Sequence, residues 1–288
     1  MLRSLSLAFL ITIALPGAAA AQTTRTIVID PGHGGSDPGG VGNGLQEKNI
    51  VLDVATRFKQ LLDADTADTS GGGRWVALRT RTNDTFVSLS ARASFANAQG
   101  ADRFMSIHAN AFGDPAAHGT ETFSFAEGST GAALRNLVQQ EMIAAWGLTN
   151  RGNKTANFAV LRETAMPAVL HELAFVTNAT DANKLRSATE RQKAAQAHLR
   201  AIQRHFGITP HIPLQALGAD DQAADDVVDD DIDGADQLDE DGGCAAGGSS
   251  SGAPGGLALF LASILIGAGG RARRSRARSG RSGRGRAG

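Results

Sequence analysis

Five side chains that could bind a metal ion or transfer protons in a hydrolysis lie beside the predicted strands and helices. His33 lies in a glycine-rich turn after one apolar segment, and Glu47 opens a segment of helical periodicity. His108 directly follows another apolar segment, and His171 and Glu172 are neighbours in a late one. Two histidines and one carboxylate with an open fourth position form a catalytic zinc site, which lowers the pKa of its water to about 7. A further carboxylate can then move the proton, so the set predicts metal-assisted hydrolysis.

The elements around these residues predict an α/β fold. Apolar runs and helical periodicity alternate along the chain, which is typical of a parallel sheet. We expect a single three-layer domain over residues 22–208, with a twisted, largely parallel sheet and helices on both faces. Ligands gather at the carboxyl ends of such strands, where histidine and carboxylate side chains from three of the strands could converge. The expected strands are 25–30, 74–79, 103–107, 119–125, 158–161 and 168–173, and the expected helices are 43–62, 89–98, 130–146 and 181–206.

Four motifs occur in an order that resembles one enzyme family. They are IVIDPGHGG at 27–35, EKNI at 47–50, SIHAN at 106–110 and PAVLHELAFVTN at 167–178. Together they resemble the zinc-dependent N-acetylmuramoyl-L-alanine amidases of the Amidase_3 type, over about residues 25–206. The resemblance implies that one zinc ion is bound by His33, Glu47 and His108, and that Glu172 is the catalytic carboxylate. The implied reaction is hydrolysis of the amide between N-acetylmuramic acid and L-alanine in peptidoglycan.

His171 departs from the family pattern, which usually has an apolar residue there. Adjacent residues of a strand point to opposite faces, so only one of His171 and Glu172 can face the site. We expect His171 to pack on the other face; the alternative is that it tunes the site from its edge.

Other polar residues have weaker signals. We expect Arg79, Arg81 and Arg92 to be structural or helix-surface residues, with contact to substrate carboxylates as the alternative. His118 precedes a strand and is expected to be exposed. Asn110 is a candidate to orient a metal ligand through a hydrogen bond.

The charge distribution excludes some functions. The 28 Lys and Arg nearly balance 29 Asp and Glu in the 288 residues, but 12 acids lie in 220–241 and eight Arg in 271–288. The central domain is therefore nearly neutral, which disfavours a nucleic-acid partner. The single cysteine, Cys244, excludes an intrachain disulfide and a Cys-rich zinc module.

Both ends of the chain resemble sorting signals. Residues 1–21 combine Arg3, a short apolar run and small residues, as in a secretory signal peptide, which predicts export. Residues 209–253 form an acidic, Gly- and Ser-rich linker expected to be disordered, 254–270 are hydrophobic, and 271–288 are Arg-rich. This tail, with Cys244 before the hydrophobic segment, resembles sorting signals typical of myxobacteria; an ordinary membrane anchor is the alternative. We expect a periplasmic or cell-surface protein, held through this segment.

The catalytic region has space for few insertions. Residues 126–157 accommodate one helix and a short loop, so we expect an enzyme without a plugging helix that needs no activator. Two other functions stay open: a zinc peptidase acting on the stem peptide, and a peptidoglycan-binding module without catalysis.

Overall fold

The sheet is mixed, with mostly parallel strands. The structure is a computed structural model that describes residues 23–213. Its six-stranded sheet has the order β4-β1-β5-β8-β6-β7, and only the β8–β6 pair is antiparallel. The strands are β1 Arg25–Pro31, β4 Trp75–Arg79, β5 Arg103–Asn110, β6 Thr120–Ser124, β7 Asn150–Thr155 and β8 Ala168–Phe175, and a separate hairpin joins β2 Val41–Gly42 to β3 Leu45–Gln46.

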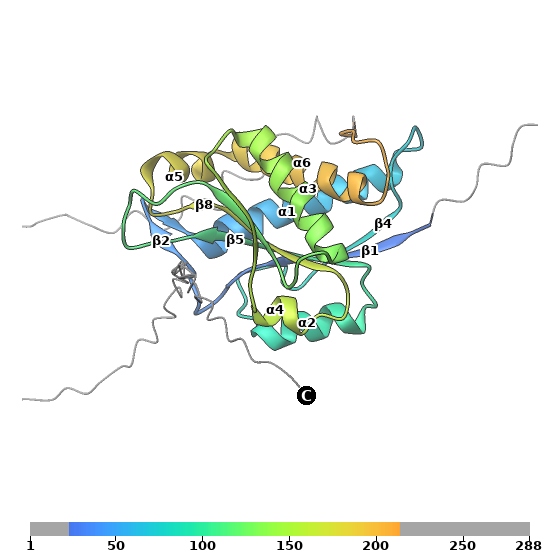
Figure 1. The fold of residues 1–288 in the computed structure, drawn as a ribbon, viewed down its shortest axis with the longest axis horizontal. Helices are drawn as coiled ribbons and strands as arrows, with labels where there is room; N and C mark the ends of the chain where they lie inside the picture. The colour runs from blue at the N-terminus through green and yellow to red at the C-terminus, as the bar shows by residue number, and fades with distance from the viewer. Residues whose placement is uncertain (1–22, 214–288) are drawn as a thin grey trace, which may run out of the picture. The chain divides into compact units, whose positions relative to one another are not determined.

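Helices cover both faces of the sheet, which confirms the predicted three-layer α/β fold (Figure 1). Four helices lie on one face: α1 Glu47–Ala67, α3 Thr130–Trp146, α5 Ala179–Arg186 and α6 Ala188–His205. Within residues 23–213 the other face carries two helices, α2 Leu89–Ala98 and α4 Ala159–Arg162. The two layers therefore differ greatly in the area that they cover.

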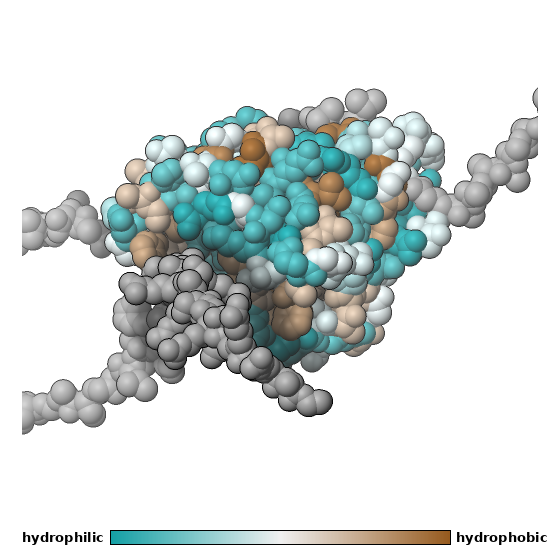
Figure 2. Space-filling view, viewed as in Figure 1, coloured by the Kyte–Doolittle hydropathy of each residue, from teal (hydrophilic) through white to brown (hydrophobic). Residues whose placement is uncertain are grey.

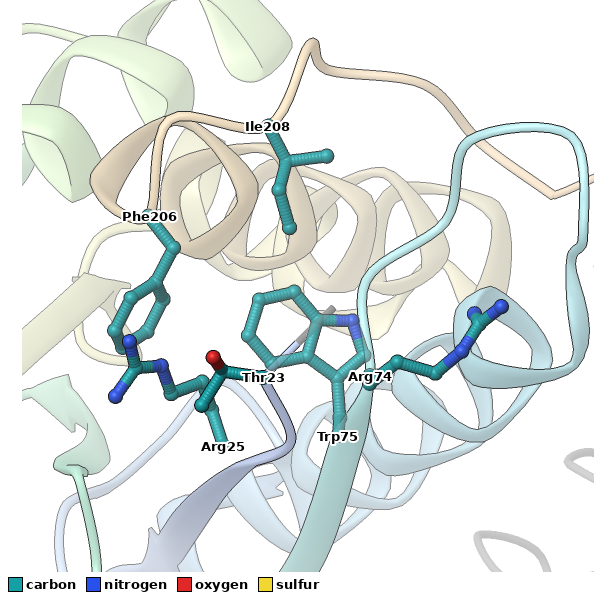
Figure 3. Close-up of a pocket in the computed structure, with 6 residues that line it drawn as sticks. All are labelled: Thr23, Arg25, Arg74, Trp75, Phe206 and Ile208. Atoms are coloured by element: carbon teal, nitrogen blue, oxygen red, sulfur yellow. The ribbon is translucent and has the colours of Figure 1, made fainter. Parts of the chain in front are cut away.

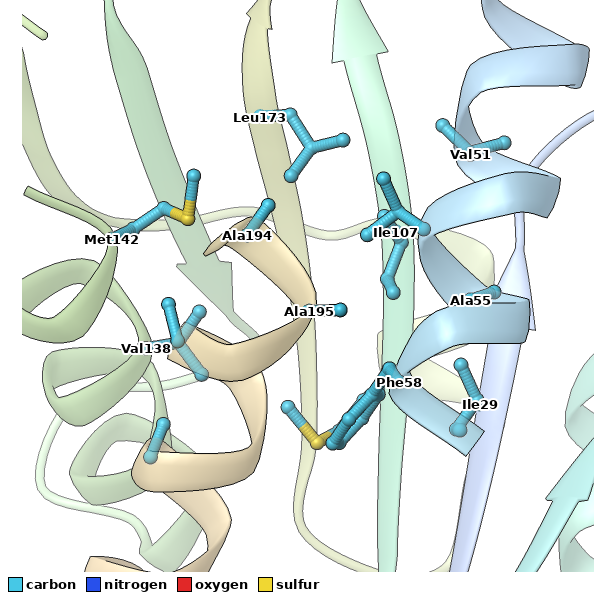
Figure 4. Packing of buried hydrophobic residues seen from close by; sticks show 14 of the residues in the cluster. Ile29, Val51, Ala55, Phe58, Ile107, Val138, Met142, Leu173, Ala194 and Ala195 are labelled. Carbon is cyan, nitrogen blue, oxygen red and sulfur yellow. The ribbon is translucent and has the colours of Figure 1, made fainter. Parts of the chain in front are cut away.

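The main core lies between the sheet and the four-helix layer (Figure 4). Phe58 of α1 packs there among aliphatic side chains, and Ala194 and Ala195 of α6 contribute small side chains to the same core. Burial of such side chains is the main favourable term in folding, at roughly 25 cal/mol per Å². A smaller apolar cluster lies under α2 and α4 and includes Val28, Phe104 and Leu170.

Most of the predicted elements are confirmed. The structure has α2 and α3 at the predicted bounds, and strands β1, β4, β5, β6 and β8 within two residues of the predicted ones at most ends. Helix α1 begins later and ends later than predicted, at Glu47 and Ala67. The hairpin of β2 and β3 takes up the residues before it.

Three predictions of secondary structure are wrong. Residues 158–161 are not a strand, because Ala159–Arg162 form one helical turn that packs on α2. The single closing helix is two helices, because Ser187 has an extended backbone and its hydroxyl accepts a hydrogen bond from the Glu190 amide, which begins α6. The loop after α3 contains the edge strand β7, whose polar sequence hides its strand character.

A small pocket lies at the amino ends of β1 and β4, away from the carboxyl ends where the candidate residues lie (Figure 3). Its volume is about 130 Å³, and the rings of Trp75 and Phe206 lie 5.6 Å apart in its wall. It is lined by Thr23, Arg25, Arg74, Trp75, Phe206 and Ile208.

The visible surface of residues 23–213 shows small, separate hydrophobic patches among hydrophilic residues (Figure 2). Among these residues, no helix has both the length and the apolar character needed to cross a membrane. The predicted signal peptide 1–21, the hydrophobic segment 254–270, the Arg-rich tail and Cys244 lie outside the described residues, as does nearly all of the linker.

His171 packs on the four-helix face, as expected. Its Nδ1 lies 3.0 Å from Nε2 of His198, and its Nε2 lies 2.9 Å from Oγ1 of Thr120. Nδ1 of His198 donates to the Ala194 carbonyl, so with both rings neutral Nδ1 of His171 donates to Nε2 of His198. The Thr120 hydroxyl lies between Nε2 of His171 and the Glu172 carbonyl, to which it donates at 3.0 Å. Burial lowers the pKa of both histidines, that of His198 to about 4.

These buried histidines make stability depend on pH. In the unfolded chain a histidine titrates near 6.5, so as pH falls from 6.5 toward 4 the unfolded state binds protons that folded His198 does not. The contribution of these neutral histidines to stability is therefore present above about pH 6.5 and is lost as the pH falls. Protonation of His198 in the unfolded chain should alone lower the free energy of unfolding by about 2 to 3 kcal/mol at pH 4.5. We expect urea unfolding to show that His198→Gln reduces the loss between pH 7.5 and 4.5, whereas His118→Gln, at an exposed position, leaves it unchanged. Equal pH dependence in wild type and His198→Gln would contradict this account.

Candidate metal centre and active site

The structure brings His33, Glu47 and His108 together from three separate segments. His33 lies in the loop after β1, Glu47 is the first residue of α1, and His108 lies in β5. Each offers one ligand atom, and these atoms lie within 4.8 Å of one another. Oε1 of Glu47 lies 3.1 Å from Nε2 of His33 and 2.9 Å from Nδ1 of His108. This cluster has the donor set of a metal centre with two imidazoles and one carboxylate.

The loop that carries His33 has an unusual backbone. His33 itself has φ of 57°, a left-handed conformation that costs free energy in a residue other than glycine. Nδ1 of His33 lies 2.8 Å from the Asp37 carboxylate, which fixes the ring and leaves Nε2 toward Glu47. A strained residue held by specific contacts is typical of a functional site.

Two glycines let the backbone approach the cluster closely. A Cβ on Gly32 would lie 2.3 Å from the His108 ring. A Cβ on Gly39 would lie 2.5 Å from Oε2 of Glu47 and 2.6 Å from Cδ2 of His33. The glycine-rich sequence of this loop therefore follows from the space that the imidazoles and the carboxylate occupy.

Two buried arginines hold the same loop from behind. Arg92 donates to the carbonyls of Pro31 and His33, at 2.6 Å each, and pairs with buried Asp30 at 2.8 Å. Arg81 donates to the carbonyls of Pro31, at 3.0 Å, and Gly32, at 2.7 Å. Both are structural, as predicted.

Glu47 is buried but held in its ionised form. Burial alone would raise its pKa, but hydrogen bonds with His108 and His33 hold the pKa well below its usual range. The backbone amides of Gly40 and Ala109 also donate to its two oxygens, at 2.7 and 2.8 Å. Burial would likewise lower the pKa of His33, but Glu47 and Asp37 raise it. The carboxylate is therefore fixed as an anion in the centre of the cluster.

Glu172 lies beside this cluster because of the strand register. It is paired with His108 across the β5–β8 ladder, on the face opposite to His171. Its Oε2 is buried and has no hydrogen-bond partner among residues 23–213. Burial and the nearby Glu47 and Glu121 carboxylates raise its pKa well above the ordinary value. A carboxyl group with a raised pKa accepts and holds a proton more readily than an ordinary glutamate, as a general acid or base must.

Comparison with known proteins identifies the family. The N-acetylmuramoyl-L-alanine amidase family, Amidase_3, matches residues 27–204. The chain belongs to this family. The sporulation-specific N-acetylmuramoyl-L-alanine amidase of Bacillus subtilis is 41% identical over 183 residues, 63% of this chain and 68% of that protein.

Solved structures of amidases have the same fold. The catalytic domain of CwlV, an amidase from Bacillus (Paenibacillus) polymyxa var. colistinus, matches at TM-score 0.59 and 34% identity, covering 64% of this chain and 99% of that one. The amidase AmiC2 of Nostoc punctiforme matches at TM-score 0.58 and 33% identity, with 65% and 99% covered. The chain is thus an amidase of peptidoglycan, as its motifs predicted.

Next to Glu172 lies a second carboxylate that the sequence analysis missed. Glu121 of β6 pairs in register with Glu172, and its buried carboxylate accepts from Asn110 at 2.9 Å and from Arg151 at 3.0 Å. Lys154 forms a further ion pair with it. Asn110 therefore orients Glu121 rather than one of the three clustered residues, contrary to its expected role. Alternation of polar residues in 119–125 was the signal that could have found Glu121.

The glycine contacts predict a selective loss of metal binding. Gly39→Ala and Gly44→Ala both place a side chain at positive φ, 67° and 73°, but only the first meets atoms of the cluster, because nothing lies within 4 Å at Gly44. Each should cost stability of about 1 kcal/mol from the backbone. We expect only Gly39→Ala to weaken divalent-metal affinity, at least 10-fold, measured as metal bound per chain after dialysis. Equal metal contents in the two variants would contradict the conclusion that a Cβ at Gly39 collides with Glu47 and His33.

Proposed function

We propose that this amidase hydrolyses the amide between N-acetylmuramic acid and L-alanine with one zinc ion bound by His33, Glu47 and His108, and with Glu172 as the catalytic carboxylate. The observation that carries the proposal is the position of Glu172, one strand from His108 on the face where the three clustered residues meet. Peptidoglycan is then the partner that this face binds.

The residues fit a zinc ion. Two imidazoles and a carboxylate are a common catalytic zinc set, and the carboxylate of Asp37 behind His33 is the usual support for a metal-bound ring. Because Gly32 and Gly39 carry no Cβ, no side chain from either residue enters the space that the three ligand side chains occupy. When bound, zinc would polarise the scissile carbonyl and acidify the attacking water.

Glu172 would move the proton of the reaction. As a carboxylate it takes a proton from the attacking water, whose oxygen bonds to the carbonyl carbon. It then gives this proton to the amide nitrogen, and the bond between carbon and nitrogen breaks. Its raised pKa supports this role, because a carboxylate with a raised pKa is a stronger base toward the water than an ordinary glutamate.

The proposal extends to the control and the location of the enzyme. The hydrogen bonds and ion pairs of His33, Glu47 and His108 within 23–213 involve no residue of 126–157, which supports activity without an activator. The signal-like residues 1–21 and the tail 254–288 support export to the periplasm or cell surface, with the tail inserted in the membrane or read by a sorting machinery. The similarity to cell-wall amidases agrees with action outside the cytoplasm.

Glu172→Gln tests the catalytic role. The amide has nearly the same shape but cannot accept a proton, so we expect amidase activity to fall about 10² to 10⁴-fold while bound zinc is unchanged. Products of peptidoglycan digestion should be identified by mass. Intact stem peptides with free L-alanine amino ends support the proposal, and Glu163→Gln, on the surface, should keep full activity.

Other outcomes separate the alternatives. Cleavage inside the stem would identify a zinc peptidase, and binding without cleavage by the wild type would indicate a binding module. A wild-type protein that is inert until a partner is added would contradict activator independence.

Zinc removal tests the metal. We expect a chelator to abolish hydrolysis and added Zn²⁺ to restore it, because the three clustered residues alone supply no Lewis acid. The melting temperature should also rise on zinc binding, since an ion that binds only the folded state stabilises it. Full activity in a protein shown to be metal-free would contradict the proposal.

A further inference from the structure

Two cations of the edge strand β7 meet beside the active site. Arg151 and Lys154 both pair with one oxygen of Glu121, whose side chain is only 7% exposed. Within residues 23–213 neither forms another ion pair, so the group of three carries one uncompensated positive charge. The two cationic side chains are 32% and 37% exposed and so remain accessible to a ligand.

These cations are held in place before any ligand arrives. The guanidinium of Arg151 lies 4.7 Å from the centre of the Phe175 ring, and the ammonium of Lys154 lies 5.6 Å from that of Phe123. Cation–π contacts of this kind add to the ion pairs with Glu121. Ligand binding would then require little loss of side-chain entropy, which favours affinity.

The chemistry of the substrate assigns these charges to one side of the scissile bond. The carboxyl group of the muramic acid lactyl substituent is itself the amide that is cleaved, so the glycan side carries no free carboxylate there. Free carboxylates belong to the peptide side. In a stem with γ-linked glutamate at the second position, the first of them is the α-carboxylate of that residue.

The distance from Glu172 to β7 agrees with the distance from the scissile bond to this second residue. Strands β8, β6 and β7 are consecutive in the sheet, so β7 lies about 10 Å from Glu172, and both cations reach back toward β6. An extended peptide advances about 3.4 Å per residue, which places the second residue about 7 Å from the scissile bond.

We propose that Arg151 and Lys154 form a subsite for the α-carboxylate of the second stem residue, which directs the peptide toward β7. The proposal rests on the proposed function, because it takes Glu172 as the point of cleavage. Charge-assisted hydrogen bonds from an arginine and a lysine are the expected recognition chemistry for a carboxylate.

Two synthetic N-acetylmuramoyl peptides test the subsite. They differ only at the second residue, where one has the γ-linked glutamate α-carboxylate and the other has a carboxamide. We expect the wild type to favour the carboxylate about 10-fold in kcat/KM, through KM. Lys154→Met and Arg151→Met should each reduce this preference, and Lys154→Arg should keep it. Lys193→Met is the matched control, because Lys193 also pairs with a glutamate but lies on α6.

A binding measurement separates this proposal from the proposed function. Calorimetry with the free stem peptides should give the same preference for the carboxylate form, lost in Lys154→Met, whether or not the lactyl amide is cleaved. Equal affinity of the wild type for both peptides would overturn the subsite. An equal loss of kcat on both substrates in Lys154→Met, with KM unchanged, would also overturn it, because Lys154 would then act through Glu172.

Discussion

The close approach of a backbone loop to two imidazoles and a carboxylate constrains the rest of this domain. Gly32 and Gly39 leave no space for a Cβ, and His33 has a left-handed backbone between them. Such a loop does not hold its shape through local preference alone. Arg92 and Arg81, both buried, bind its carbonyls and so tie it to the elements that follow β1.

The two helix layers cover the two faces of the sheet unequally. The four-helix layer buries one face of the sheet, whereas α2 and α4 cover the other face only where Val28, Phe104 and Leu170 form the smaller cluster. Further along the same face, the side chains change from apolar to ionisable: His108 and Glu172 lie in register across β5 and β8. Glu172 lies two residues after Leu170 in β8, and His108 lies four residues after Phe104 in β5. The apolar cluster and the site are therefore neighbours on the same face of the sheet.

The sequence predicts the part of the site that lies at the ends of apolar strands and misses the part on polar segments. His33, His108 and Glu172 follow or occupy recognisable buried strands, so their convergence follows from the parallel topology. β7 has the sequence NRGNKT, without apolar alternation, because it is an edge strand that buries little. The sequence pattern therefore does not predict that its cations lie beside Glu121; the pairing of β6 with β7 and β8 shows it. Residues 158–161 show the opposite error: their apolar run predicts a strand, but they form a helical turn. A short apolar run does not distinguish the two.

Glu47, Glu121 and Glu172 show how neighbouring carboxylates on one face acquire different protonation. Hydrogen bonds with His33 and His108 lower the pKa of Glu47, and Lys154, Asn110 and Arg151 lower that of Glu121. Glu172 has burial and two nearby negative charges but no hydrogen-bond partner for its Oε2 in the described chain, so its pKa rises. Environments that push the pKa values of adjacent acids apart separate fixed charges from the group that transfers protons. Glu121 is thus a fixed charge held by Lys154, Arg151 and Asn110, whereas Glu172 is the carboxyl group whose proton is free to move.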